Sequence, residues 1–273
     1  MENRQDSSTH TAWSNPVLSR LRTGRPVMGM TMVTNSVEAA AHAASLGFHF
    51  LWVEMEHSPV TLETLRLVVL ASRSLPAVIF ARVPVNEIWT AKRVLDQGVA
   101  GVIFPFTGSP ELAVQAAEAC RYPPLGKRGS GAGLATATWP EKGNYYDSAD
   151  RNVMVVAVIE EKRALAHIDA IAATPGVDVL FIGTSDLSFS LGLRGRQDDP
   201  LLQEAIGQIV AAAQRHGKFL GRPAGTAEQI RQYVEQGFLF FQVCTELGLM
   251  TLGAREIFEP LWGNGSSTAS PLY

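Results

Sequence analysis

The sequence predicts an α/β protein whose strands close into a (β/α)₈ barrel within a single domain. Short apolar runs of strand length recur along the chain, and each is followed by a segment with helical periodicity. Near-continuous apolar strands joined by helices form a parallel sheet that is covered on both faces. Eight such units of about thirty residues favour a closed barrel over an open, doubly wound sheet. No phosphate-binding glycine motif follows the first strand, which disfavours a nucleotide-binding fold.

The first four units follow one another without interruption. We expect strands at 27–32, 48–55, 77–82 and 100–106, and helices at 36–47, 61–74, 86–98 and 109–121. Asn86 is the expected cap of the third helix, and Ser109 caps the fourth, with Pro110 at its first helical position.

The regular alternation is interrupted once, by a stretch rich in glycine, proline and aromatic residues from Tyr122 to about Asn152. We expect this stretch to be irregular. The last four units then place strands at 153–159, 177–183, 218–222 and 238–243, and helices at 161–173, 200–217, 226–237 and 246–261, with a short helical turn at 185–193.

Composition narrows the class of protein. A hydrophobic fraction of 46% is ordinary for a chain with a sizeable core, and a net charge of −3 disfavours binding to nucleic acid or to anionic membranes. No apolar stretch has the length of a membrane span, and the polar N-terminus is no secretory signal. We therefore expect a cytoplasmic protein with loose tails at 1–15 and 263–273 around a barrel domain at 16–262, and with Cys120 and Cys244 reduced and buried.

Ionisable residues end four of the expected strands. Glu54 to His57 follow the second strand, Arg82 ends the third, Glu160 ends the fifth, and Asp186 comes shortly after the sixth. In a (β/α)₈ barrel the active site forms at this C-terminal face. The sequence therefore predicts that these side chains converge.

The predicted set has a coherent chemistry. Two carboxylates with water suit a hard divalent cation, which would act as a Lewis acid on a 2-oxo acid and stabilise its enolate. Arg82 would donate to the developing oxyanion, and His57 would carry the proton at neutral pH. Structural roles stay open for each residue: Glu160 at a helix start, Asp186 as a cap, His57 shaping its loop, and Arg82 in an ion pair.

Four motifs in the expected order resemble the HpcH/HpaI aldolase family, the metal-dependent pyruvate aldolases that include 4-hydroxy-2-oxoheptanedioate aldolase and 2-dehydro-3-deoxyglucarate aldolase. The resemblance covers about residues 26–258. Its motifs are MEHSP at 55–59, ACRYPPLGKRGSG at 119–131, IEEKRAL at 159–165 and FIGTSDLSFSLG at 181–192.

The resemblance implies a TIM-barrel enzyme that cleaves a 4-hydroxy-2-oxo acid reversibly to pyruvate and an aldehyde. It implies Glu160 and Asp186 as ligands of magnesium, manganese or cobalt (zinc is also compatible), and Arg82 as the contact to pyruvate. It implies His57 as the acid/base residue. Thr184, Ser185 and Asp186 would receive the pyruvate carboxylate at a helix N-terminus.

The resemblance also implies a homohexamer in which the C-terminal helix is exchanged between subunits and the 126–131 loop approaches a neighbour.

The sequence departs from the family pattern around these residues. Glu54 replaces the aspartate that orients the histidine in the family, and Met55 replaces a glycine, so we expect an altered Glu54–His57 dyad and added bulk near the substrate. Val158 replaces a glutamine of the pyruvate pocket, Thr184 replaces a proline, and Thr31 stands where an aromatic residue is common. These departures concern the substrate more than the chemistry.

Two other readings remain. Oxaloacetate decarboxylation or cleavage of a CoA ester, as in citrate-lyase relatives, would use the same enolate, and a barrel without catalysis would serve only for binding. A Schiff-base aldolase needs a lysine inside the barrel, whereas Lys218 only begins the seventh strand.

Overall fold

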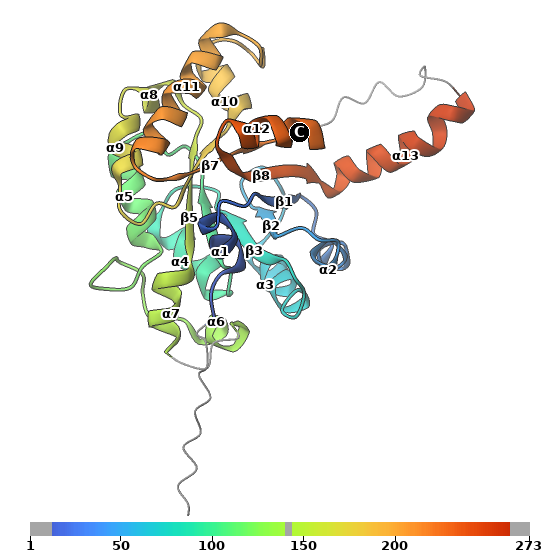
Figure 1. Cartoon of the computed structure of the whole chain (residues 1–273). Helices are drawn as coiled ribbons and strands as arrows, with labels where there is room; N and C mark the ends of the chain where they lie inside the picture. The colour runs from blue at the N-terminus through green and yellow to red at the C-terminus, as the bar shows by residue number, and fades with distance from the viewer. Residues whose placement is uncertain (1–12, 140–143, 263–273) are drawn as a thin grey trace, which may run out of the picture.

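The computed structural model describes residues 13–139 and 144–262, and it confirms the closed barrel in a single domain (Figure 1). Eight parallel strands pair in chain order, and the last strand pairs with the first to close the ring. The strands are β1 (Val27–Met32), β2 (Phe50–Glu54), β3 (Val78–Arg82), β4 (Gly101–Phe104), β5 (Met154–Ile159), β6 (Val179–Ile182), β7 (Phe219–Pro223) and β8 (Phe238–Thr245).

Side chains alternate between the inside and the outside of the barrel. The inner cluster contains five large aromatic rings, from Phe50, Trp52, Phe80, Phe181 and Phe240. Inward-facing glycines make room for them, because a Cβ at these positions would collide with a neighbouring ring; they are Gly29, Gly101 and Gly221. The rings fill the barrel below the C-terminal face and form the floor on which the polar strand ends lie.

Helices surround the barrel and follow the predicted order (Figure 1). Ser109 caps its helix as predicted, with Pro110 at the first position. The helices are α1 (Pro16–Arg22), α2 (Val37–Ser45), α3 (Leu62–Ala71), α4 (Ile88–Asp96), α5 (Pro110–Ala119), α6 (Gly133–Thr138), α7 (Tyr145–Asn152), α8 (Lys162–Leu165), α9 (Ile168–Ala173), α10 (Thr184–Ser190), α11 (Pro200–Arg215), α12 (Ala227–Glu235) and α13 (Glu246–Trp262).

Two local predictions about the helices are wrong. Asn86 does not cap α4, which begins after Glu87; the Asn86 side chain is buried and donates instead to the carbonyl of Leu112. The single helix expected at 161–173 is two short helices. The His167 N–H bonds to the Ala164 carbonyl, three residues back rather than four, and the chain turns there.

The stretch from Tyr122 to Asn152 is less irregular than predicted, since it contains α6 and α7. Arg128 holds part of it in place: its guanidinium is buried, bonds to Asp96 and to the Tyr145 hydroxyl, and stacks over Tyr122. The RYPPLGKRG motif therefore has a structural role here, fastening the excursion to α4.

Asn15, which was expected in the N-terminal tail, lies within the described chain. Asn15 is fully buried, donates to the carbonyls of Ala100 and Asn152, and caps α1 through its side chain. Helix α1 packs three apolar side chains against the inner cluster, at the end of the barrel where the strands start. Residues 1–12 and 263–273, where tails were expected, lie outside the described residues.

Helix α13 leaves the barrel wall directly after β8 and extends away from the rest of the molecule (Figure 1). The Glu246 carboxylate anchors its start by accepting hydrogen bonds from the backbone N–H groups of Val33 and Thr34. Among the described residues, no helix combines the length and the apolar character that a membrane span requires.

Candidate active site

A cavity of about 710 Å³ opens at the C-terminal ends of the strands, where the sequence predicted the site. Side chains from β2, β3, β5, β6, β7 and β8 contribute to its wall. The predicted residues that line it are His57, Arg82, Glu160, Thr184, Ser185 and Asp186. The structure therefore brings the predicted residues together, apart from Glu54, which lies behind the wall.

Glu54 is a buried anchor at the end of β2, only 2% exposed. Its Oε1 accepts from the backbone N–H groups of Glu56 and His57 at 2.7 and 3.0 Å. Its Oε2 accepts from Arg82 Nε at 2.6 Å and from Trp52 Nε1 at 3.2 Å. Four donors thus satisfy one carboxylate, which fixes both the β2–α3 loop and the arginine.

The side chain of Arg82 bridges two carboxylates. Besides the bond to Glu54, its Nη1 lies 3.2 Å from Glu56 Oε2. The guanidinium also lies 5.6 Å from the centre of the Trp52 ring, within the range of a cation–π contact. These contacts hold the planar group at the cavity wall through its Nε and Nη1 atoms.

Glu160 is buried at the end of β5, with its position set by two neighbouring segments. Its Oε1 accepts from the backbone N–H of Phe106, whose φ of 48° lies in the left-handed region. Gly183 allows the carboxylate to approach β6, because a Cβ there would lie 2.8 Å from Glu160 Oε2. Burial raises the pKa of Glu160 to about 7, against the lowering effects of the Phe106 N–H and Arg82.

Glu56 joins the cluster and was not among the residues proposed from sequence. Burial raises its pKa to about 7; Arg82 lowers it, while Glu54 and Asp186 raise it further. Glu56 Oε2 is shielded from solvent and accepts no hydrogen bond from the described residues. The signal was present in the MEHSP motif, but a sequence does not show that Glu56 turns inward beside Arg82.

The carboxyl groups at this face outnumber the arginine that they surround. Glu54, Glu56, Glu160 and Asp186 face one arginine, and two of the four carboxyls have raised pKa values. The described residues contain no group of three histidine, cysteine or acidic side chains arranged to enclose a metal. Glu160 and Asp186 are two carboxylates beside the cavity, a pair of oxygen donors that would suit a hard divalent cation if water or substrate supplied its other ligands.

Asp186 belongs to the first turn of α10, which starts at the cavity wall. Gly183 precedes the helix, and no side chain of the described residues caps its N-terminus. Asp186 therefore does not act as the cap. Thr184 and Ser185 line the cavity beside it, so the first turn of α10 borders the space where substrate would lie.

His57 lies on the rim, with 48% of its side chain exposed. The expected contact between the Glu54 carboxylate and the imidazole is not seen among the described residues. Glu54 binds the His57 backbone N–H, and the carboxylate near the ring is Glu56, 3.7 Å from Nε2. Glu54 is therefore placed to position the loop and Arg82, and the imidazole is free to reach into the cavity.

The departures from the family pattern fall on different sides of the wall. Val158 faces the cavity, so this part of the wall is apolar. Met55 packs against the hydrophobic cluster outside the barrel and does not line the cavity, so the expected bulk near the substrate is absent. Thr31 accepts a hydrogen bond from Gln242, and Gln242 lines the cavity. Cys244 was expected to be buried but is only half-buried, in the cavity wall.

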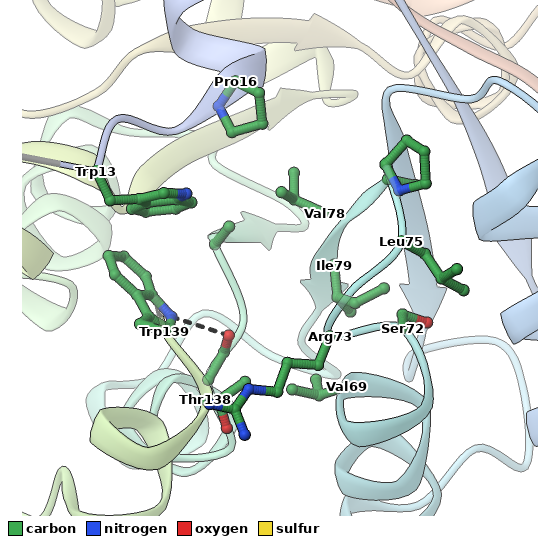
Figure 2. Close-up of a pocket in the computed structure, with 14 residues that line it drawn as sticks. Trp13, Pro16, Val69, Ser72, Arg73, Leu75, Val78, Ile79, Thr138 and Trp139 are labelled. Atoms are coloured by element: carbon green, nitrogen blue, oxygen red, sulfur yellow. Dashed lines mark hydrogen bonds between the residues drawn. The ribbon is translucent and has the colours of Figure 1, made fainter. Parts of the chain in front are cut away.

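A smaller cavity of about 230 Å³ lies at the opposite end of the barrel, against the starts of β3 and β4 (Figure 2). The Trp13 and Trp139 rings lie 4.5 Å apart beside it, and Trp139 Nε1 donates to the Gly98 carbonyl. Among the described residues of its lining, Arg73 is the only ionisable one, so acid and base groups do not converge there as they do at the C-terminal face.

A (β/α)₈ barrel with carboxylates, an arginine and a histidine at the C-terminal strand ends has the architecture of a barrel enzyme. Residues 28–251 match the family model described as HpcH/HpaI aldolase/citrate lyase. The chain belongs to that family, as the motifs predicted.

Similar proteins are aldolases. The chain is 32% identical over 255 residues to the hydroxypyruvate/pyruvate aldolase of Paraburkholderia phytofirmans, covering 91% of this chain and 98% of that protein. It is 36% identical over 216 residues to the 5-keto-4-deoxy-D-glucarate aldolase of Klebsiella pneumoniae, covering 78% and 83%. A solved HpcH/HpaI aldolase/citrate lyase family protein from Burkholderia cenocepacia superposes with a TM-score of 0.83, at 30% identity and with 90% and 99% coverage. The prediction of a carbon–carbon lyase is confirmed.

Proposed function

We propose that the protein is a class II aldolase that cleaves a 4-hydroxy-2-oxo acid reversibly to pyruvate and an aldehyde. The observation that supports this most directly is the convergence of Glu160, Asp186 and Arg82 in one cavity, beside an exposed histidine. The similar aldolases named above agree with it.

Each polar residue has a distinct role in this proposal. Glu160 and Asp186 hold a divalent cation, which supplies Lewis-acid chemistry to a 2-oxo acid when bound. Arg82, fixed by Glu54, donates to the oxygen on which negative charge develops. Thr184 and Ser185, at the uncapped start of α10, face the substrate carboxylate. His57 moves the proton at the acceptor end, where the cavity is open to solvent.

The arrangement of lysines disfavours a Schiff-base mechanism. Among the residues that the structure describes, no lysine lines the cavity. Lys218 Nζ donates to the carbonyls of Thr174 and Val177, at the end of the barrel where β7 starts. The substrate carbonyl therefore has no amine partner in the described site, which agrees with metal-dependent chemistry.

Exchange of the pyruvate methyl protons for deuterium tests the proposal, because exchange requires the enolate but no aldehyde. We expect exchange by proton NMR with added manganese or magnesium, and loss of exchange after chelation or in Glu160→Gln. Full exchange by chelated protein would contradict metal dependence, and no exchange with saturating metal would support a non-catalytic barrel. Oxaloacetate decarboxylation needs the same enolate, so retro-aldol cleavage of a hydroxy-oxo acid must be measured beside it.

We also propose that α13 packs against a second copy of the chain in a homo-oligomer, as the family resemblance implies. The helix extends from the barrel (Figure 1), and large apolar side chains are exposed along it. Exposed apolar surface of this extent is typical of an interface. The side chains are Leu247, Leu249, Met250, Leu252, Ile257 and Leu261.

A further inference from the structure

A second cavity, of about 500 Å³, adjoins the catalytic one on the outer side of the barrel wall. It lies between the end of β7, helix α12 and the segment that leads into α11. The two cavities share part of their walls, so only this rim separates them. The shared residues are Thr184, Gln197, Pro223, Ala224 and Gly225.

Arg222, on β7, lines this second cavity and is more than nine-tenths buried, with 8% exposed. Its guanidinium carbon lies 3.6 Å from the centre of the Tyr233 ring and 5.2 Å from that of Phe238. Its Nε is shielded from solvent and lacks a hydrogen-bond acceptor within the described chain. No carboxylate of the described residues lies within 4.0 Å of it.

Arg222 carries a positive charge in an apolar part of the fold. It points out of the barrel, into the layer between strands and helices, where its neighbours on the sheet are Leu220 and Phe241. These two neighbours belong to the hydrophobic cluster outside the barrel. A cation buried there without a counter-ion is costly, and aromatic faces offset only part of the cost. An anion in the adjoining cavity would offset the rest.

The rest of the lining is suited to a polar ligand. Gln203, Gln229 and Gln236 contribute side-chain amides from α11, α12 and the residue after α12. Gln229 Oε1 already accepts from the Gly225 N–H, so its remaining polar group is the NH₂ donor. Asp198, the one carboxylate among the described residues of the lining, is exposed.

We propose that this cavity is an anion-binding site, in which Arg222 pairs with a carboxylate, sulfonate or phosphate of a small organic molecule. The planar guanidinium, stacked on Tyr233, presents its free edge to the ligand, and the glutamine amides bind the neutral polar part. Two sources of the anion share this chemistry: the far end of an acceptor aldehyde that extends over the rim, or a separate small anion.

Direct binding tests the site without relying on catalysis. Sodium sulfate is titrated calorimetrically into metal-free protein, into Arg222→Leu and into Arg231→Gln. Arg231 is the matched control, because it is a solvent-exposed arginine on α12, paired with Glu228. We expect Arg222→Leu to weaken the sulfate site at least tenfold and Arg231→Gln to leave it unchanged. Equal binding by Arg222→Leu and the parent protein would overturn the proposal.

A second measurement covers the case in which Arg222→Leu does not fold. Crystals of the unmodified protein are soaked in selenate, whose anomalous signal locates the ion. Selenate within hydrogen-bond distance of Arg222 supports the site, and a cavity without selenate at saturating concentration overturns it.

Steady-state kinetics then show whether the anion belongs to the acceptor aldehyde or to a separate molecule. This measurement rests on the proposed aldolase function. Pyruvate addition is measured with succinic semialdehyde, which ends in a carboxylate, and with uncharged butanal. If the acceptor supplies the anion, Arg222→Leu raises KM for succinic semialdehyde at least tenfold and leaves butanal unchanged. If sulfate binding is lost but both KM values are unchanged, the anion is a separate molecule. Lack of turnover with either aldehyde would count against the aldolase function and leave the binding result intact.

Discussion

Arg82 is held by two carboxylates from the end of β2, and the two contacts have different consequences. Glu54 binds Nε and is itself fixed by three further donors, whereas Glu56 contacts the other edge and lies among carboxylates. Glu54 therefore sets the position of the guanidinium. The pKa of Glu56, by contrast, depends on the charges of the residues around it.

We expect Glu54→Gln to lower kcat roughly 10- to 100-fold and to destabilise the protein by about 1–3 kcal/mol. Each oxygen of Glu54 accepts from two donors, so whichever oxygen the Gln NH₂ replaces, the hydrogen bonds at that atom are lost. Initial rates and urea unfolding measure the two effects. Glu38→Gln, on the exposed face of α2, is the matched control and should leave both unchanged. Wild-type kcat in Glu54→Gln would show that Glu54 does not position Arg82.

The buried carboxyl of Glu160 predicts a pH dependence for the metal-free protein. Its pKa is about 7 in the folded chain, against an ordinary value of 4.5, so the folded state binds the proton more tightly than the unfolded state does. The resulting stabilisation is complete below about pH 4.5 and is lost as the pH rises through about 7. At one pKa unit per 1.36 kcal/mol it amounts to at most about 3 kcal/mol.

Urea unfolding from pH 5 to 8, with chelator present, checks this prediction. The free energy of unfolding should fall over that range in the parent protein, and the fall should be smaller in Glu160→Gln, whose side chain does not titrate. Glu56 contributes a fall of the same sign, so the variant retains part of it. An identical pH profile in both proteins would contradict the raised pKa of Glu160.

For individual residues, the sequence predicted which side chains converge but not which hydrogen bonds fix each of them. Arg82, Glu160 and Asp186 could be placed because strand ends meet at one face of a barrel. The hydrogen-bond donors to the Glu54 carboxylate could not be predicted, because they depend on how the β2–α3 loop orients its backbone N–H groups. Met55 was misplaced for the same reason: the loop directs it outward.

Among the elements, the strands were predictable because each contains a run of apolar residues that is visible in the local sequence. The observed strand ends differ from the predicted ones by only one or two residues at most positions. Helices α1, α6 and α7 were not recognised. They are only 7, 6 and 8 residues long, too short for a clear periodic pattern. Their stability comes from tertiary contacts, which a single sequence does not show.

The contact between Asn15 and Asn152 is the clearest such case, since it joins the start of α1 to the end of α7. Asn152 Oδ1 accepts from the Asn15 N–H at 2.8 Å, and its Nδ2 donates to the carbonyls of Trp13 and Ser148. We expect Asn152→Ala to cost about 2–4 kcal/mol, because it leaves buried donors and acceptors unpaired. Thermal unfolding measures the loss.

The catalytic cavity lies at the other end of the barrel from this contact, so kcat at low temperature should stay near the parent value in Asn152→Ala. Asn144→Ala provides the comparison, because Asn144 is an exposed residue at the opposite end of α7. A large drop in kcat with unchanged stability would mean that the excursion is coupled to the site, against its proposed structural role.

For the molecule as a whole, the two ends of the barrel differ in the residues that they present. The polar cluster occupies the C-terminal face, whereas α1 and the tryptophan-lined cavity close the other end (Figure 2). Helix α13 starts at the C-terminal face, since it follows β8 directly, and its anchor Glu246 bonds to the loop after β1. A partner that covers α13 would therefore border the active-site face.

The exposed apolar side chains of α13 lead to a prediction about the oligomeric state of the protein. We expect the protein to be an oligomer, and the double variant Met250→Glu, Ile257→Glu to dissociate it. The two side chains are 69% and 64% exposed in the isolated chain. Burial of each in an interface is worth about 1.5–3 kcal/mol, so their joint replacement by charges should weaken association by roughly 100-fold or more.

Light scattering after size exclusion, over a range of protein concentrations, measures this association. Leu201→Glu is the control, because Leu201 is an exposed leucine on α11, outside α13. Circular dichroism separates dissociation from unfolding. A monomeric parent protein would contradict the proposed interface, and so would a double variant that keeps the parent oligomeric state. If the variant is a folded monomer that still exchanges pyruvate protons, the pyruvate half of the site is complete within one chain, as the contacts of Arg82 and Glu160 lead us to expect.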